Sequence, residues 1–167
     1  LSSWAGDQAD ISVIGAQILF GSVQRPRYDG KFTVQDTGVL VVRWITFTDR
    51  LHGAFVAYGE SSIYVHNCRF DNGRSRTPPD ATTGWMAGGA IHVEGGFLEV
   101  KSTEFVGNAA YASSAFTYGG AIFAANSPTV EVDDCKFESN QATRGGAIYI
   151  NGGSLLVTNS IFDIHES

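Results

Sequence analysis

Two adjacent carboxylates, Asp133 and Asp134, are the residues of this 167-residue sequence whose types and spacing come closest to a catalytic pair. Enzymes that cleave glycosidic bonds place two carboxyl groups across a cleft. A basic group, Lys101, stands at the position equivalent to Asp133 one repeat earlier. The simplest interpretation of Lys101 and Asp133 is a surface ion pair, worth about 0–1 kcal/mol. These three residues are the catalytic candidates, but the sequence favours a non-catalytic protein.

Other common chemistries lack the residues that they require. The four histidines (His52, His66, His92 and His165) form no metal-ligand spacing with an acid or a cysteine, so we expect neither a metal nor another cofactor. The net charge of −6 argues against nucleic acid as a partner, because nucleic-acid binders carry a basic face. No run of about 18 apolar residues predicts a transmembrane segment. We therefore expect membrane association only through a partner.

The framework that must position any site is an internal repeat. Gly-Ala followed by Phe or Ile begins at Gly53, Gly89, Gly120 and Gly146, with a weaker copy at Gly30. A second pattern follows each copy. Counted from its first apolar residue, it has another apolar residue two positions later, a mostly small residue five positions later and an aromatic residue, called the ring position here, seven positions later. The rings are Phe47, Phe70, Phe105, Phe137 and Phe162. A degenerate first copy assigns Ile11 and Val13 to the apolar positions and Ile18 to the ring position.

These offsets predict short strands separated by corners. Residues two apart share one face of a strand, and the longer step between them turns a corner. One coil cannot cover its own apolar face, so coils must stack, at a spacing of about 4.8 Å. We predict an all-β fold, a right-handed parallel β-helix (solenoid) of about six coils. It should be one domain over residues 1–167, the ordered part of a longer chain.

Two other folds fit the pattern less well. No segment keeps apolar residues at i, i+3, i+4 and i+7 through three turns, which excludes amphipathic helices. A β-sandwich also uses short strands, but it predicts hairpins with mirrored patterns. Here the order of the pattern is the same in every copy.

Stacking brings equivalent residues of successive coils together in columns, and several columns have a predicted structural role. The five rings should form an internal aromatic ladder. Asn108 and Asn140 each follow a ring by three residues, and we expect their side chains to bond to backbone at a corner. Cys68 and Cys135 share a column two coils apart, about 9.6 Å along the stack. That distance exceeds the limit of about 7 Å for a disulfide, so we predict two free, buried thiols.

Two insertions and one strand column are the predicted partner-binding surfaces. The insertions, 73–87 and 109–118, leave adjacent coils at the same corner, so they should lie side by side; a third loop is predicted at 21–30. Loops on a rigid scaffold often carry function. The residues expected to bind a partner there are Arg74, Arg76, Trp85, Tyr111, Phe116 and Tyr118.

The strand column lies between inward-facing residues and reads Val56, His92, Phe123 and Tyr149. Ala54, Ala90, Ala121 and Ala147 are expected to flank it on the outer face. A strip so poor in charge often marks an interface. The alternative is that the inserted loops fold back and cover the strip.

The Gly-Gly-Ala-Ile and Phe-x-x-Asn elements resemble the repeats of the polymorphic outer-membrane protein (Pmp) family. Both elements are complete in two places, from Phe105 to Ile122 and from Phe137 to Ile148. The resemblance covers residues 30–167 and is weakest before residue 53. It implies a β-helical protein that is secreted or exposed at the cell surface and takes part in adhesion.

The sequence therefore favours a non-catalytic structural or adhesive protein. Its partner would be another protein, or a glycan, bound through the loops and the outer aromatic strip. One alternative is a polysaccharide-binding or polysaccharide-cleaving β-helix of the lyase or glycosidase type. Another is an accessory subunit of a large membrane or organelle complex. Secretion or surface exposure is the expected location, with an organelle lumen as the alternative.

Overall fold

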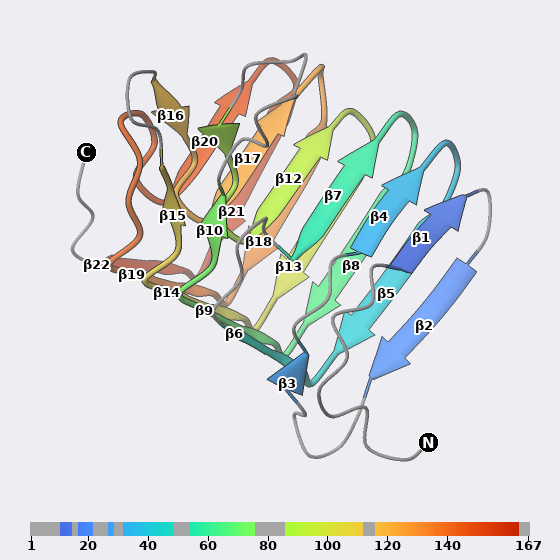
Figure 1. The fold of residues 1–167 in the computed structure, drawn as a ribbon, viewed down its shortest axis with the longest axis horizontal. Helices are drawn as coiled ribbons and strands as arrows, with labels where there is room; N and C mark the ends of the chain where they lie inside the picture. Colours follow the sequence, from blue (N-terminus) through green and yellow to red (C-terminus); the bar gives the residue numbers. More distant parts are fainter. Residues whose placement is uncertain are drawn as a thin grey trace.

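Short β-strands wind through three parallel sheets in turn, and each circuit forms one coil of a solenoid (Figure 1). The computed structural model describes residues 11–14, 17–21, 27–28, 32–48, 54–75, 86–111 and 116–163. Each of the three sheets has six strands, and every pairing within them is parallel. The predicted all-β parallel solenoid is thus confirmed.

The three sheets, named A, B and C here, follow one another along the chain in every coil. Sheet A contains β1 (Ile11–Ile14), β4 (Phe32–Gln35), β7 (Phe55–Tyr58), β12 (Ile91–Glu94), β17 (Ile122–Ala125) and β20 (Ile148–Asn151). Sheet B contains β2 (Gln17–Gly21), β5 (Val39–Arg43), β8 (Ser62–His66), β13 (Phe97–Lys101), β18 (Thr129–Asp133) and β21 (Ser154–Thr158). Sheet C contains β3 (Arg27–Tyr28), β6 (Thr46–Thr48), β9 (Arg69–Asp71), β14 (Glu104–Val106), β19 (Lys136–Glu138) and β22 (Ile161–Asp163).

Strict alternation of side chains explains why these segments are strands. In β5, β8 and β13 the second and fourth residues are buried, and their neighbours are half-exposed. Successive side chains of a strand point to opposite faces, so one face enters the core and the other faces outward. The buried faces of the three sheets meet in a single hydrophobic core.

The corner between sheets B and C uses one residue with positive φ in each of five coils. These residues are Trp44, Asn67, Ser102, Asp134 and Asn159, with φ between 47° and 55°. Asn and Asp tolerate this left-handed conformation, whereas a bulky residue such as Trp44 rarely adopts it. The corner therefore needs a residue with positive φ at this position, and four of these five coils have a short polar residue there.

Both glycines before Ala-Ile are required, the second by the close approach of the next coil and the first by a turn within its own coil. A Cβ atom on Gly120 would lie 2.0 Å from the carbonyl oxygen of Gly146 in the next coil. Gly119 has a φ of 62°, and a Cβ there would lie 2.1 Å from the carbonyl oxygen of Ile122. No larger residue fits either position without moving backbone.

The phenylalanine column stacks through the interior as one ladder. Consecutive ring centroids from Phe47 to Phe162 lie 4.7–4.8 Å apart with interplanar angles of 2–10°. The first four rings are at most 1% exposed. Phe162 is 45% exposed, because its outer ring face has no further described coil beyond it. Parallel strand register forces this stacking, since each Phe pairs directly with the Phe of the next coil.

Two asparagines form a second internal ladder beside the rings. Asn108 donates from Nδ2 to the carbonyl oxygen of Phe70 (3.0 Å) and to Oδ1 of Asn140 (3.0 Å), and its Oδ1 accepts from the N–H of Gly73 (2.9 Å). Asn140 donates in the same way to the carbonyl oxygen of Phe105 (3.0 Å). Both asparagines are fully buried. They satisfy backbone groups where the chain leaves sheet C, which is the role expected of them.

The cysteine column is also internal. Cys68 and Cys135 are free thiols, and both are buried. Thr103 lies between them, and its Oγ1 accepts a hydrogen bond from the N–H of Cys68 (3.2 Å). Burial raises the pKa of the Cys135 thiol to about 11. The thiols therefore behave as small core residues.

The register predicted for the first coil is wrong. Ile11 and Val13 lie in sheet A, opposite Phe32 and Val34, and not in the sheet that follows. Ile18 pairs with Leu40 of sheet B, and Tyr28 takes the place beside Phe47 in the ring column. Arg27 and Tyr28 thus form a strand within the predicted loop 21–30. Apolar residues two apart occur in every sheet of the solenoid, so this spacing alone could not assign the first segment to one of them.

The alanines before the sheet A strands are also misplaced by the sequence-based prediction. Ala54, Ala90, Ala121 and Ala147 are at most 5% exposed and belong to the core, not to the outer face. They stand at a corner where strand alternation does not yet apply. The N–H groups of Ala90 and of the following Ile91 bond to the same carbonyl oxygen, that of Ala121. The chain is therefore still turning at Ala90, and its methyl group points inward.

Candidate functional site

The two insertions rise between sheets C and A and carry short strands of their own (Figure 1). Strand β10 (Arg74–Ser75) pairs with β15 (Ala109–Ala110), and β11 (Met86–Ala87) pairs with β16 (Thr117–Tyr118). Two further bridges join Ala109 to Gln141 and Tyr118 to Arg144. The described ends of the insertions therefore lie side by side and continue the parallel stacking of the coils. Arg76 and Trp85 lie outside the described residues.

The return of the second insertion is firmly fixed to the next coil. Thr117 and Thr143 exchange hydrogen bonds, from the Thr117 N–H to Oγ1 of Thr143 (2.6 Å) and from the Thr143 N–H to Oγ1 of Thr117 (2.8 Å). The Thr143 hydroxyl also donates to the Thr117 carbonyl oxygen (2.9 Å). Tyr118, the next residue, is consequently held in one place above sheet A.

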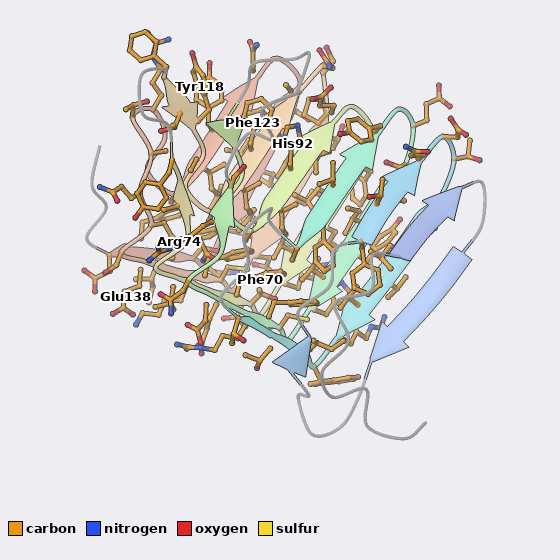
Figure 2. The ribbon with its side chains drawn as sticks, viewed as in Figure 1. Phe70, Arg74, His92, Tyr118, Phe123 and Glu138 are labelled. Carbon is orange, nitrogen blue, oxygen red and sulfur yellow. The ribbon has the colours of Figure 1, made fainter. Side chains whose placement is uncertain are left out.

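Tyr118 covers part of the predicted aromatic strip. The outward column of sheet A does align Val56, His92, Phe123 and Tyr149 in adjacent strands. The Tyr118 ring lies 4.7 Å from that of Tyr149 and 6.4 Å from that of Phe123. Phe123 is only 2% exposed as a result. Phe123 is therefore wrong as a contact residue, and the alternative, in which an insertion folds back over the strip, holds at this position (Figure 2).

His92 lies between Val56 and Phe123 in this column and is half-buried. Its ring packs 4.8 Å from Phe123 on one side and 6.5 Å from Tyr58 on the other. His92 Nε2 lies 2.9 Å from Oε1 of Glu94 on the same strand. This hydrogen bond lowers the pKa of the Glu94 carboxyl despite its partial burial. Burial, together with the charge of Glu94, raises the pKa of Tyr58. His92 and Glu94 thus form a hydrogen-bonded pair against aromatic rings.

Arginines stacked on aromatic rings characterise the insertions themselves. Arg74 Cζ lies 5.6 Å from the Tyr111 ring centroid, and Arg144 Cζ lies 4.7 Å from that of Phe116 and 5.8 Å from that of Tyr118. Tyr111 is 40% exposed and Phe116 is 60% exposed. We call these five residues the insertion edge. Cations placed over ring faces in this way attract the ring and are themselves held in position.

The acidic candidates do not converge on a common point. Asp133 Oδ1 accepts from Oγ1 of Thr158 (2.7 Å) and Nδ2 of Asn159 (2.9 Å), and these bonds lower the Asp133 pKa. Asp134 Oδ2 accepts from the Ser102 hydroxyl (2.8 Å). Each carboxylate thus joins its corner to the neighbouring coil. In this arrangement both acids connect neighbouring coils at the corner.

Lys101 pairs differently from the interpretation made from the sequence. Its Nζ lies 2.6 Å from Oε2 of Glu99, two residues earlier on the same strand, and no ion pair joins it to Asp133. The other Glu99 oxygen, Oε1, lies 2.7 Å from Nε2 of His66. Burial alone would raise the pKa of Glu99, but the bonds from Lys101 and His66 outweigh it and lower that pKa. Within the described ranges, no group of three or more His, Cys, Asp or Glu could hold a metal ion.

Arg144 was not singled out from the sequence, although a signal for it was present. Tyr118 and Arg144 each stand immediately before the Gly-Gly of their coil, so the repeat itself aligns them. Glu94 and Tyr58 could be found in a similar way, because they follow His92 and Val56 by two residues on strands that the pattern predicts. The stacking of Arg144 on Phe116 was not predictable, since Phe116 lies in the insertion and outside the repeat.

Comparison with known protein families gives one match, which covers most of the chain. The family model described as "Right handed beta helix region" matches residues 28–166. Neither the curated proteins nor the solved structures gave a match. No described residue lies in a helix that is long and apolar enough to cross a membrane. The narrower resemblance to the polymorphic outer-membrane proteins stays an expectation.

Proposed function

Because the chain belongs to the right-handed β-helix family, we propose that it is a rigid, non-catalytic scaffold that binds a macromolecular partner through its insertion edge. The β-helix fold is compatible with adhesive roles and with roles on polysaccharides. The proposal places the protein in the adhesive or structural group, at a cell surface or outside the cell. It assigns recognition to the insertions and support to the coils.

The observation that carries this proposal is the group of exposed rings and arginines on the insertions. Tyr111 and Phe116 are large rings left open to solvent in a molecule whose phenylalanines are otherwise mostly buried. Tyrosine, phenylalanine and arginine are the residue types enriched in protein interfaces, and arginine and tyrosine often dominate their binding energy. Rings that are fixed before binding lose little freedom when a partner arrives.

The scaffold beneath the insertion edge favours the same function. Buried ring and asparagine ladders tie each coil to the next, so the strands that carry the insertions cannot move independently. Recognition surfaces are often loops held by a rigid framework. The acidic residues Asp133 and Asp134, in contrast, already bond to neighbouring coils, which disfavours a catalytic role.

The native mass of the full-length protein, extracted gently from its source, tests the proposal. We expect a complex larger than the chain alone, and we expect the double variant Tyr111→Ser/Phe116→Ser to release the partner while keeping the wild-type circular dichroism spectrum. Trp44→Asn is the matched control, because it removes another exposed ring (43%) at a distant corner where two coils already have Asn.

Two results would contradict the proposal. A partner that stays bound to the double variant would remove the insertion edge from recognition. A monomer that cleaves polysaccharide, with calcium dependence and release of reducing ends, would establish the lyase or glycosidase alternative instead.

A further inference from the structure

The insertion edge carries two arginines that have no acidic partner, and we infer from them that it recognises a carboxylate-bearing polypeptide segment. Arg74 and Arg144 are both exposed, and neither makes an ion pair within the described part of the chain. This inference rests on the proposed function and names the chemistry of the partner.

Other cations of the described strands, in contrast, pair with acids on their own or the neighbouring strand. Arg69 bonds to Asp71 (2.8 Å) and to Glu104, Lys101 bonds to Glu99 (2.6 Å), and Lys136 bonds to Glu138 (2.5 Å). The chain has 17 acidic residues against 11 Lys and Arg, so carboxylates are plentiful. Arg43 also lacks an ion pair, but it lies on sheet B, away from the insertions. At the insertion edge two arginines without an ion pair to a described residue each lie over an exposed or half-buried ring.

Stacking leaves the binding edge of each guanidinium available. A guanidinium packed on a ring uses its flat face for that contact, and its N–H groups point outward in the plane. A carboxylate can accept two parallel hydrogen bonds from that edge. The rings below therefore fix the arginines in an orientation suited to an incoming acid, with less loss of side-chain freedom than for an unsupported arginine.

The positions of the two arginines constrain the ligand. Arg74 pairs in register with Ala109, and Ala109 bridges to Gln141, which lies in the same coil as Arg144. The arginines thus belong to coils two steps apart, or about 10 Å along the stack. An extended polypeptide advances about 3.3 Å per residue. Two carboxylates four residues apart on an extended strand share one face and span about 13 Å, enough to reach both arginines.

A polypeptide fits the insertion edge better than an acidic polysaccharide. Sugars stack on open ring faces, but Arg144 occupies faces of Phe116 and Tyr118, and Arg74 occupies one of Tyr111. The open ring surface therefore lies beside a charged guanidinium at each position, and Phe116 is still 60% exposed. Apolar side chains between spaced acids would complement such a surface.

Binding of fluorescently labelled poly-L-glutamate, measured by anisotropy at low salt, tests the inference. This probe offers every spacing of carboxylates. We expect it to bind the wild-type protein, and we expect Arg74→Gln/Arg144→Gln to weaken that binding at least tenfold. Lys101→Gln/Lys136→Gln removes the same charge from exposed side chains that are already paired, and it should bind like the wild type. Polygalacturonate serves as the competing polyanion.

Several outcomes would overturn the inference. These are no binding of poly-L-glutamate by the wild type, equal binding by the arginine variant, equal loss in the lysine variant, or binding of polygalacturonate in place of the polypeptide. A failure here would leave the proposed function standing if Tyr111→Ser/Phe116→Ser still releases the native partner. Retention of the native partner by that ring variant would remove the proposed function as well.

Discussion

Replacing Asn108 by Ala should strongly reduce the stability of the protein. The substitution removes three hydrogen bonds of 2.9–3.0 Å, to Phe70, Asn140 and Gly73. Each such bond contributes about 1 kcal/mol, and a buried donor left without a partner adds about 1–3 kcal/mol. The N–H of Gly73 is buried and would become such a donor. We expect a total loss of about 4–6 kcal/mol in the free energy of unfolding.

Urea unfolding followed by circular dichroism measures this loss, with the free energy taken from linear extrapolation. Asn151→Ala is the control, because Asn151 lies on strand β20 with an exposed side chain. Its change should stay within about 0.5 kcal/mol, as for most surface substitutions. If the Asn108 variant lost no more than about 1 kcal/mol beyond this control, the asparagine ladder would not be the tie between coils that its geometry suggests.

Three further predictions concern the corners, the thiols and the pH dependence. Gly120→Ala should prevent soluble expression, because the added Cβ would clash with the backbone of Gly146. In Gly59→Ala the nearest atom to the added Cβ would be 3.7 Å away, so only the positive φ is unfavourable, and the free energy of unfolding in the same urea assay should fall by about 1–2 kcal/mol. The thiol of Cys135, with its pKa of about 11, should react with Ellman's reagent at pH 8 only after unfolding; fast reaction of the native protein would contradict its burial. Glu99 has a lowered pKa in the folded state, so its contribution to stability is present above pH 4.5 and is lost as the pH falls through the folded value. Urea midpoints between pH 6 and pH 3 should fall more in the wild type than in Glu99→Gln.

The repeating parts of the molecule could be predicted from the sequence because each coil has the same spacing of buried apolar and aromatic residues. Five copies of the ring position fixed the register of sheets B and C from Phe47 onward. The first coil has no Phe at that position, and its register was consequently assigned to the wrong sheet. The inward turn of Ala90 depends on a shared carbonyl at a corner, which strand periodicity does not describe. The cover that Tyr118 places over Phe123 depends on the path of an insertion, and no repeat constrains that path.

The distribution of charge explains why the insertion edge, and not a sheet face, is the best candidate for recognition. On sheets B and C, opposite charges stand two residues apart on the same strand and pair with each other: Lys101 with Glu99, Arg69 with Asp71, and Lys136 with Glu138. Residues i and i+2 of a strand share a face, so the strand itself brings each pair together. A partner that approaches such a face meets charges that are already neutralised. Arg74 and Arg144 have no acid two residues away in the sequence, since Asn72, Arg76, Ala142 and Gly146 stand at those positions. The lack of a neighbouring acid is thus what leaves their charge available for binding.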